Sequence, residues 1–86
     1  MAVSEALLFC QNTWRWLNDG GCWAVPRSGL MYRKDEAAMQ LVLYARVPWD
    51  AEMPMTPAQL LEQQDSDHAM NVEMFGMAGI TVVDAT

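Results

Sequence analysis

A strand pattern in the middle of the chain constrains the fold more than any other feature. Over residues 39–47, apolar side chains alternate with a mixed set, which is the period of an extended strand. The apolar face would hold Met39, Leu41, Leu43, Ala45 and Val47, and the mixed face Gln40, Val42, Tyr44 and Arg46. A sheet with one wholly apolar face has to be covered by a second layer, so we expect helices to pack against it.

The N-terminal part of the chain has the features of one such helix. Ser4 is a suitable N-cap, and Glu5 in the first turn complements the helix dipole. Apolar residues then recur at helical spacing as far as Leu17. The pair Gly20-Gly21 supplies the left-handed backbone geometry that ends helices, so we expect the helix to stop there.

A second helix is predicted to begin at Pro57. Thr56 at the N-cap, Pro57 at the first helical position and Gln59 at the third form a capping box. Gly76 or Gly79 would end the helix. The inward stripe would be Leu61, Asp65 or His68, Val72 and Phe75, supported by Leu60, Ala69 and Met74, and the outward face Glu62, Gln63, Asp67 and Glu73.

Three shorter pieces, residues 22–25, 30–34 and 80–83, complete the expected sheet. The order is then α-β-β-β-α-β, or α-β-β-α-β if residues 22–25 are irregular. We expect an α+β fold, a small two-layer sandwich in which an antiparallel or mixed sheet of three to four strands carries two helices on one face. With 86 residues there is room for one core, so residues 1–86 should form a single domain.

Charge is distributed unevenly along the chain, whose net charge is −6. Residues 48–86 contain seven acidic residues and neither lysine nor arginine, whereas residues 1–47 contain all five basic residues. The acidic part is either a solvated surface that keeps the domain soluble or a face that docks on a basic partner. Direct binding to nucleic acid is not expected, because phosphate contacts need clustered lysine and arginine.

Few residues suggest chemistry. Asp65 and Asp67 stand two apart on the predicted helix and point in different directions, so we expect no metal site there, and no cofactor. A small thiol enzyme using Cys22 and His68 is one alternative, although neither residue lies in a signature motif. Two cysteines do not make a disulfide framework, and no apolar run is long enough to span a bilayer. We therefore expect a cytoplasmic protein without a membrane role.

The apolar content is high for so short a chain, with four tryptophans and eight methionines. These side chains either cap the two ends of a small core or form an adaptable contact surface. We favour a non-enzymatic protein-binding module, with a homo-oligomeric structural protein as an alternative. The predicted partner-binding residues are Trp16, Trp49, Asp50, Glu52, Met53, Met55, Glu62, Asp67 and Glu73.

In size and charge alone, the chain resembles the small acidic proteins that phages and mobile elements encode to inhibit a host complex, including anti-CRISPR proteins. That resemblance implies an inhibitor that occupies a surface of a larger assembly. It assigns no role to any residue.

Overall fold

The computed structural model describes residues 3–86 and has the predicted order of elements, α-β-β-β-α-β. The elements are α1 (Val3–Trp16), β1 (Cys22–Val25), β2 (Leu30–Asp35), β3 (Gln40–Arg46), α2 (Pro57–Met77) and β4 (Thr81–Asp84). Within the described residues, neither helix combines the length and the apolar character that crossing a membrane requires.

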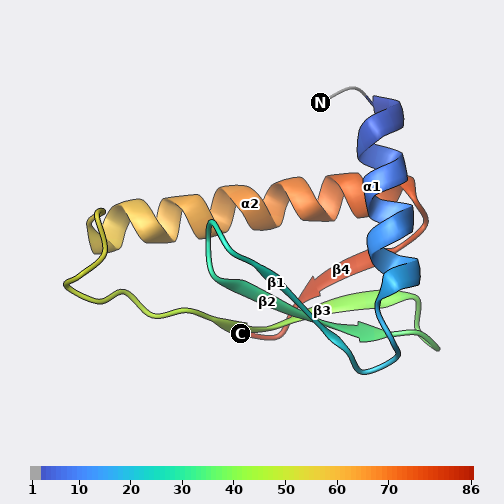
Figure 1. Cartoon of the computed structure of the whole chain (residues 1–86), viewed down its shortest axis with the longest axis horizontal. Coiled ribbons are helices and arrows are strands. Elements are labelled where there is room, and N and C mark those ends of the chain that lie inside the picture. The colour runs from blue at the N-terminus through green and yellow to red at the C-terminus, as the bar shows by residue number, and fades with distance from the viewer. Residues whose placement is uncertain (1–2) are drawn as a thin grey trace.

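The four strands form one mixed sheet in the order β1-β2-β3-β4. The first three strands are antiparallel neighbours, whereas β4 runs parallel to β3. Parallel neighbours need a crossover connection, and α2 supplies it. Both helices lie on the same side of the sheet, with α2 along the strands and α1 crossing the C-terminal end of α2 (Figure 1).

The core lies between the helices and the sheet. It consists of Cys10, Leu17, Leu30, Tyr32, Leu41, Leu43, Phe75, Ile80 and Val82. The fold class is therefore confirmed as a small α+β sandwich with both helices on one face of the sheet.

One lysine joins the end of α1 to the sheet. Lys34, on β2, is almost completely buried, and its Nζ donates to the main-chain carbonyls of Trp14 at 2.7 Å and Leu17 at 3.0 Å. The last carbonyls of a helix have no partner within the helix and carry the negative end of its dipole. The ammonium also lies 4.3 Å from the centroid of the Trp14 ring. Lys34 therefore caps α1 and holds it on the sheet.

The face of β3 that covers the core differs from the prediction at its far end. The pairing with β2 passes from Tyr32↔Leu43 to Met31↔Ala45, so that Tyr44 is an extra residue in a bulge. Beyond the bulge the alternation is reversed, and Arg46 is paired with the buried Leu30. Ala45 is consequently not on the core face, and β3 ends before Val47, which is exposed.

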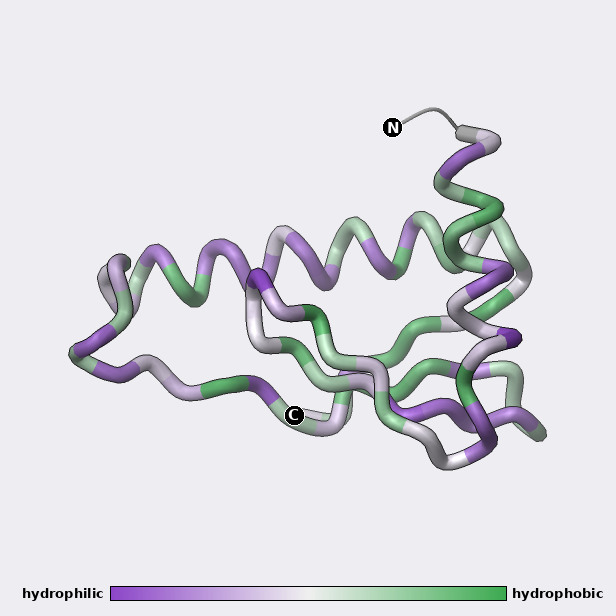
Figure 2. The backbone as a smooth tube through the Cα atoms, viewed as in Figure 1, coloured by the Kyte–Doolittle hydropathy of each residue, from purple (hydrophilic) through white to green (hydrophobic). Residues whose placement is uncertain are grey.

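The buried face of α2 agrees with the prediction at Leu60 and Phe75 and differs from it elsewhere. Its buried residues are Leu60, Gln64, Asp67, Asn71 and Phe75. Leu61 and Val72, which were expected inside, are 55% and 42% exposed, and Asp65 is exposed as well. Figure 2 shows hydrophilic and hydrophobic residues alternating along most of α2. With apolar residues around most of the helix, apolar spacing alone did not identify the buried face.

Hydrogen bonds explain why polar residues occupy that face. The Gln64 side-chain amide donates to the carbonyls of Ser28 and Val47, both at 3.0 Å, and Asn71 donates to the Tyr32 hydroxyl at 3.2 Å. Buried polar groups are tolerated when they are bonded in this way. The predicted start of α2 is confirmed, since both hydrogen bonds of the capping box between Thr56 and Gln59 are present.

Replacing Lys34 by methionine should destabilise the fold by about 1–3 kcal/mol, because two helix carbonyls would lose their buried donor. Urea denaturation of Lys34→Met and of the wild type measures the difference. Arg33→Met, at the exposed neighbouring position on β2, is the control and should change stability by less than about 0.5 kcal/mol. Equal stability of Lys34→Met and Arg33→Met would contradict the capping role.

Candidate functional site

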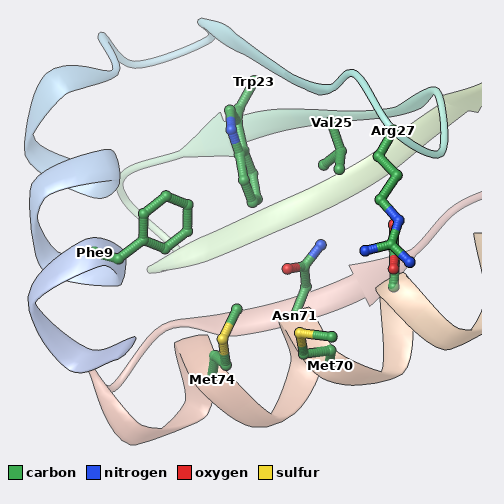
Figure 3. A pocket seen from close by; sticks show the side chains of 8 residues that line it. Phe9, Trp23, Val25, Arg27, Met70, Asn71 and Met74 are labelled. Carbon is green, nitrogen blue, oxygen red and sulfur yellow. The ribbon is translucent and has the colours of Figure 1, made fainter. Parts of the chain in front are cut away.

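An apolar groove opens between β1 and α2, where β1 is the edge strand of the sheet. Its volume is about 270 Å³, and we call it the β1–α2 groove. Its lining residues are Phe9, Trp23, Val25, Arg27, Asp67, Met70, Asn71 and Met74. Figure 3 shows the Trp23 and Val25 side chains on one side, the two methionines of α2 on the other, and Phe9 from α1 at one end.

Aromatic packing makes the wall formed by Trp23 rigid. The Trp23 ring stacks on Tyr32 with centroids 5.5 Å apart and lies 5.4 Å from the Phe75 ring. Phe9 meets Trp23 edge-on at 6.0 Å. The opposite wall is adaptable, because Met70 is half exposed and methionine side chains are flexible. A rigid aromatic wall facing flexible methionines suits an apolar guest of variable shape.

The floor of the groove is polar and fully bonded. Asn71 donates to the Tyr32 hydroxyl at 3.2 Å, and the same hydroxyl is hydrogen-bonded to His68 Nδ1 at 2.7 Å. Burial raises the pKa of the Tyr32 hydroxyl, and the bond from Asn71 offsets part of that rise. Tyr32 and His68 therefore form a hydrogen-bonded pair behind the groove.

A second hollow of about 300 Å³ continues the groove toward the start of α2. We call it the polar hollow; it is lined by Arg27, Gln59, Glu62, Gln63, Ser66, Asp67 and Met70. Arg27 donates to the Gln63 side chain across it at 3.2 Å, and Gln63 in turn donates to Asp67 at 2.7 Å. An apolar compartment and a polar compartment thus lie side by side along one edge of the molecule.

The size of the groove limits what it can hold. Small-molecule sites usually enclose about 300–1,000 Å³ and bury most of their ligand. The β1–α2 groove, at about 270 Å³, is smaller and open on one side. It fits one or two apolar side chains of a larger partner better than a whole cofactor.

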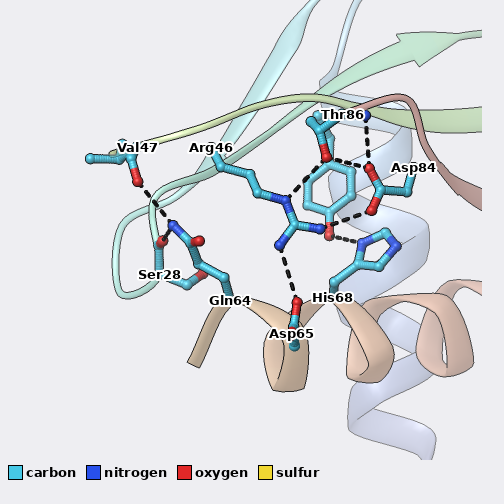
Figure 4. Close-up of polar contacts among 9 residues, drawn as sticks. Ser28, Arg46, Val47, Gln64, Asp65, His68, Asp84 and Thr86 are labelled. Atoms are coloured by element: carbon cyan, nitrogen blue, oxygen red, sulfur yellow. Dashed lines mark hydrogen bonds and ion pairs between the residues drawn. The ribbon is translucent and has the colours of Figure 1, made fainter. Parts of the chain in front are cut away.

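A polar cluster at the opposite edge of the sheet ties β3, β4 and α2 together (Figure 4). Arg46 pairs with Asp84 at 2.8 Å and with Asp65 at 3.2 Å, and Thr86 bonds both Arg46 and Asp84. The bonds from Thr86, together with Arg46, lower the pKa of Asp84 from 3.8 to about 2. The cluster joins two strands and α2 through ion pairs and hydrogen bonds, so we assign it a structural role.

Asp84 should make the fold less stable in acid. Its pKa is lower in the native state than in the unfolded chain, so its contribution is complete above about pH 4 and is lost as the pH falls toward 2. Asp84→Asn should therefore be less stable than the wild type at neutral pH, and the difference should shrink as acid is added. Urea midpoints at about pH 6 and pH 2.5 measure this. Glu73→Gln, an exposed change of the same charge, should keep the wild-type profile; a matching profile for Asp84→Asn would contradict the assignment.

The predicted partner-binding residues fall into three groups. Trp16 is 76% exposed and borders a shallow hollow beside Trp23, next to the apolar end of the groove. Glu62 is exposed at the polar hollow. Glu73 is also exposed, but it lies eleven residues further along α2, a helical rise of about 16 Å. Asp67 was expected outside but is only 9% exposed, because it faces the groove and accepts from Gln63.

The loop between β3 and α2 holds the remaining predicted residues. Trp49 Nε1 donates to the carbonyl of Met55 at 2.7 Å, which closes the loop on itself. Met53 and Met55 are half-buried and line a hollow of about 200 Å³ with the turn between β1 and β2. Asp50 and Glu52 are exposed, and the Asp50 carboxylate accepts from the Glu52 main chain at 2.8 Å. The loop is a folded structure that adjoins the groove through Arg27.

Cys22 and His68 lie on opposite faces of the sheet. Cys22 is exposed on the uncovered face, where the Tyr44 hydroxyl donates to its sulfur at 3.0 Å, and this bond raises the pKa of Tyr44. His68 is bonded to Tyr32 beneath α2. The thiol-enzyme alternative required these two side chains to meet, and this structure does not bring them together. Cys10 is buried in the core.

No group of three or more potential metal-ligating side chains occurs among residues 3–86. Asp65 is bonded to Arg46 and Asp67 to Gln63, on different sides of α2. These two carboxylates therefore do not converge.

Sequence reasoning did not single out the groove residues Phe9, Val25, Met70 and Met74. They come from three elements, and only the packing of α1 and α2 over the edge strand brings them together. Comparison of the chain with protein-family models, curated proteins and solved structures gave no match. A function for the site is therefore inferred from its geometry.

Proposed function

We propose that this protein is a non-enzymatic protein-binding module whose β1–α2 groove receives apolar side chains of a partner. The observation that carries the proposal is the groove itself, an open apolar hollow with a rigid Trp23 wall and a flexible Met70 and Met74 wall. Aromatic residues and methionine are enriched at the centres of protein interfaces, where most of the binding energy is concentrated.

Charge supports a basic partner. Helix α2 carries four acidic residues and neither lysine nor arginine. Asp65 is paired with Arg46 and Asp67 is buried, so Glu62 and Glu73 are the acids of α2 that project freely into solvent. Like-charged patches of this kind steer a partner of opposite charge and make association sensitive to salt.

An inhibitor of a larger host complex is a finer form of the same proposal. Such a protein acts by filling a surface of its target, which requires a binding face and no catalytic chemistry. Its support is the small size and the acidic charge of the chain. We also propose a cytoplasmic location, since Cys10 and Cys22 are both free thiols.

Substituting Met70 should separate groove binding from folding. Peptides selected from a displayed library of random decapeptides on the wild-type protein should bind Met70→Glu at least about tenfold more weakly, because a charge would enter the apolar groove. Met70 is 50% exposed, so the substitution should leave the fold intact. Calorimetric titration measures the affinities, and thermal unfolding checks the fold.

Leu61→Glu is the matched control. Leu61 lies on the same helix and is 55% exposed, but it does not line the groove. It should bind the selected peptides as the wild type does. A library whose selected peptides bind Met70→Glu and the wild type equally would refute the proposed function.

A further inference from the structure

We propose that the partner segment binds as a fifth strand on β1, with alternate apolar side chains in the β1–α2 groove and a basic side chain beside Glu62. This inference rests on the proposed function and specifies the form of the ligand. It follows from three features of one edge of the molecule. These are the free peptide groups of β1, the open groove beside β1, and the excess of acidic side chains on α2.

The peptide groups of Cys22 and Ala24 point away from the sheet. In an antiparallel pair, residues bonded to the neighbouring strand alternate with residues whose peptide groups face outward. The hydrogen bond from Lys34 N to Gly21 O shows which residues of β1 bond to β2. Counting from Gly21, the peptide groups of Trp23 and Val25 bond to β2, and those of Cys22 and Ala24 face outward. Among the described residues, no main-chain group outside the sheet bonds to Cys22 or Ala24. Two donors and two acceptors are thus available to an added strand.

The groove occupies the place where the inner side chains of an added strand would lie. Trp23 and Val25 point to the helix side of β1, and residues of a new strand placed opposite them would point the same way. There they would meet Met70, Met74 and Phe9, which line the groove beside β1 (Figure 3). The groove is therefore the unfilled end of the layer between the helices and the sheet.

The dimensions set the pattern of the ligand. Side chains on one face of a strand are about 7 Å apart, at every second residue. From Met74 to Glu62 is twelve residues of α2, or about 18 Å, which about five extended residues span. The ligand is accordingly a short extended segment with apolar residues at two alternate positions, followed by a basic residue near the polar hollow.

Charge distinguishes a foreign segment from a second copy of this chain. Pairing of two β1 edges would bring two α2 helices side by side, each with four acids and no lysine or arginine. Like charges at close range oppose that arrangement. A segment with lysine or arginine would instead enter a hollow where two carboxylates, Glu62 and Asp67, outnumber the one guanidinium of Arg27. The occupant is therefore a basic, extended segment of another protein.

Backbone methylation of a bound peptide tests this geometry directly. The probe is the tightest decapeptide selected from the random library, resynthesised with one N-methyl group at each position in turn. If the peptide adds to β1, N-methylation should weaken binding about tenfold at every second residue and have little effect at the residues between. The reason is that only alternate N–H groups of the peptide face β1. Replacing its lysine or arginine by glutamine should reduce both the affinity and its dependence on salt.

The matching change on the protein is Ala24→Pro. It removes an outward N–H without breaking a bond to β2, since proline is tolerated on edge strands. We expect about tenfold weaker binding of the same peptide, whereas Ala24→Val, which keeps the N–H, should bind as the wild type does.

The outcomes separate the two proposals. Binding that depends on Met70 but is unaffected by Ala24→Pro and by N-methylation would overturn the added strand and leave the proposed function standing. Selected peptides without any basic residue would overturn the charge assignment. A light-scattering mass of a dimer that Ala24→Pro converts to a monomer would show that a second copy occupies the edge, against this inference. Binding insensitive to Met70→Glu would overturn the proposed function itself.

Discussion

The burial of the Lys34 ammonium beneath the end of α1 is the interaction on which the rest of the structure depends. A buried charge is costly unless it is compensated, and the carbonyls of Trp14 and Leu17 provide the compensation together with the Glu36 carboxylate at 3.8 Å. Their position fixes the end of α1 relative to β2. Since α1 carries Phe9, which closes one end of the β1–α2 groove, the groove depends on this cap as well.

Helix α2 is held on the sheet by polar side chains as well as by the apolar Leu60 and Phe75. Gln64 and Asn71 reach main-chain and side-chain oxygens that would otherwise be buried without donors. This arrangement determines which residues remain outside. It turns Met70 and Met74 toward the edge strand and leaves Leu61 and Val72 in solvent. The adaptable wall of the groove is thus a consequence of how the polar residues are satisfied.

The functional proposal joins an apolar groove, an edge strand and an acidic helix that lie side by side. Each feature alone is common in small domains. Together they match the requirements of strand addition, in which main-chain bonds provide affinity and pockets for alternate side chains provide specificity. The surface is built for recognition, and the polar clusters around it, such as Arg46 with Asp65 and Asp84, maintain the scaffold.

Local signals in the sequence were sufficient to determine the order of elements, because caps, turns and alternation act over a few residues. The capping box at Thr56 and the alternation through Leu41 and Leu43 were predicted and are present. On α2, Leu60 and Phe75 are buried as predicted, whereas Leu61 and Val72 are exposed. The predicted outward position of Asp67 and core position of Ala45 were also wrong. The buried face of α2 depends on partners distant in sequence, because Gln64 bonds to Ser28 and Asn71 bonds to Tyr32. The position of Ala45 depends on how β3 pairs with β2, which places a bulge at Tyr44. The groove also arose only from tertiary packing, since its walls come from α1, β1 and α2. Short-range sequence patterns thus determined which helices and strands form. Hydrogen bonding between segments distant in sequence decided which faces of these elements pack together.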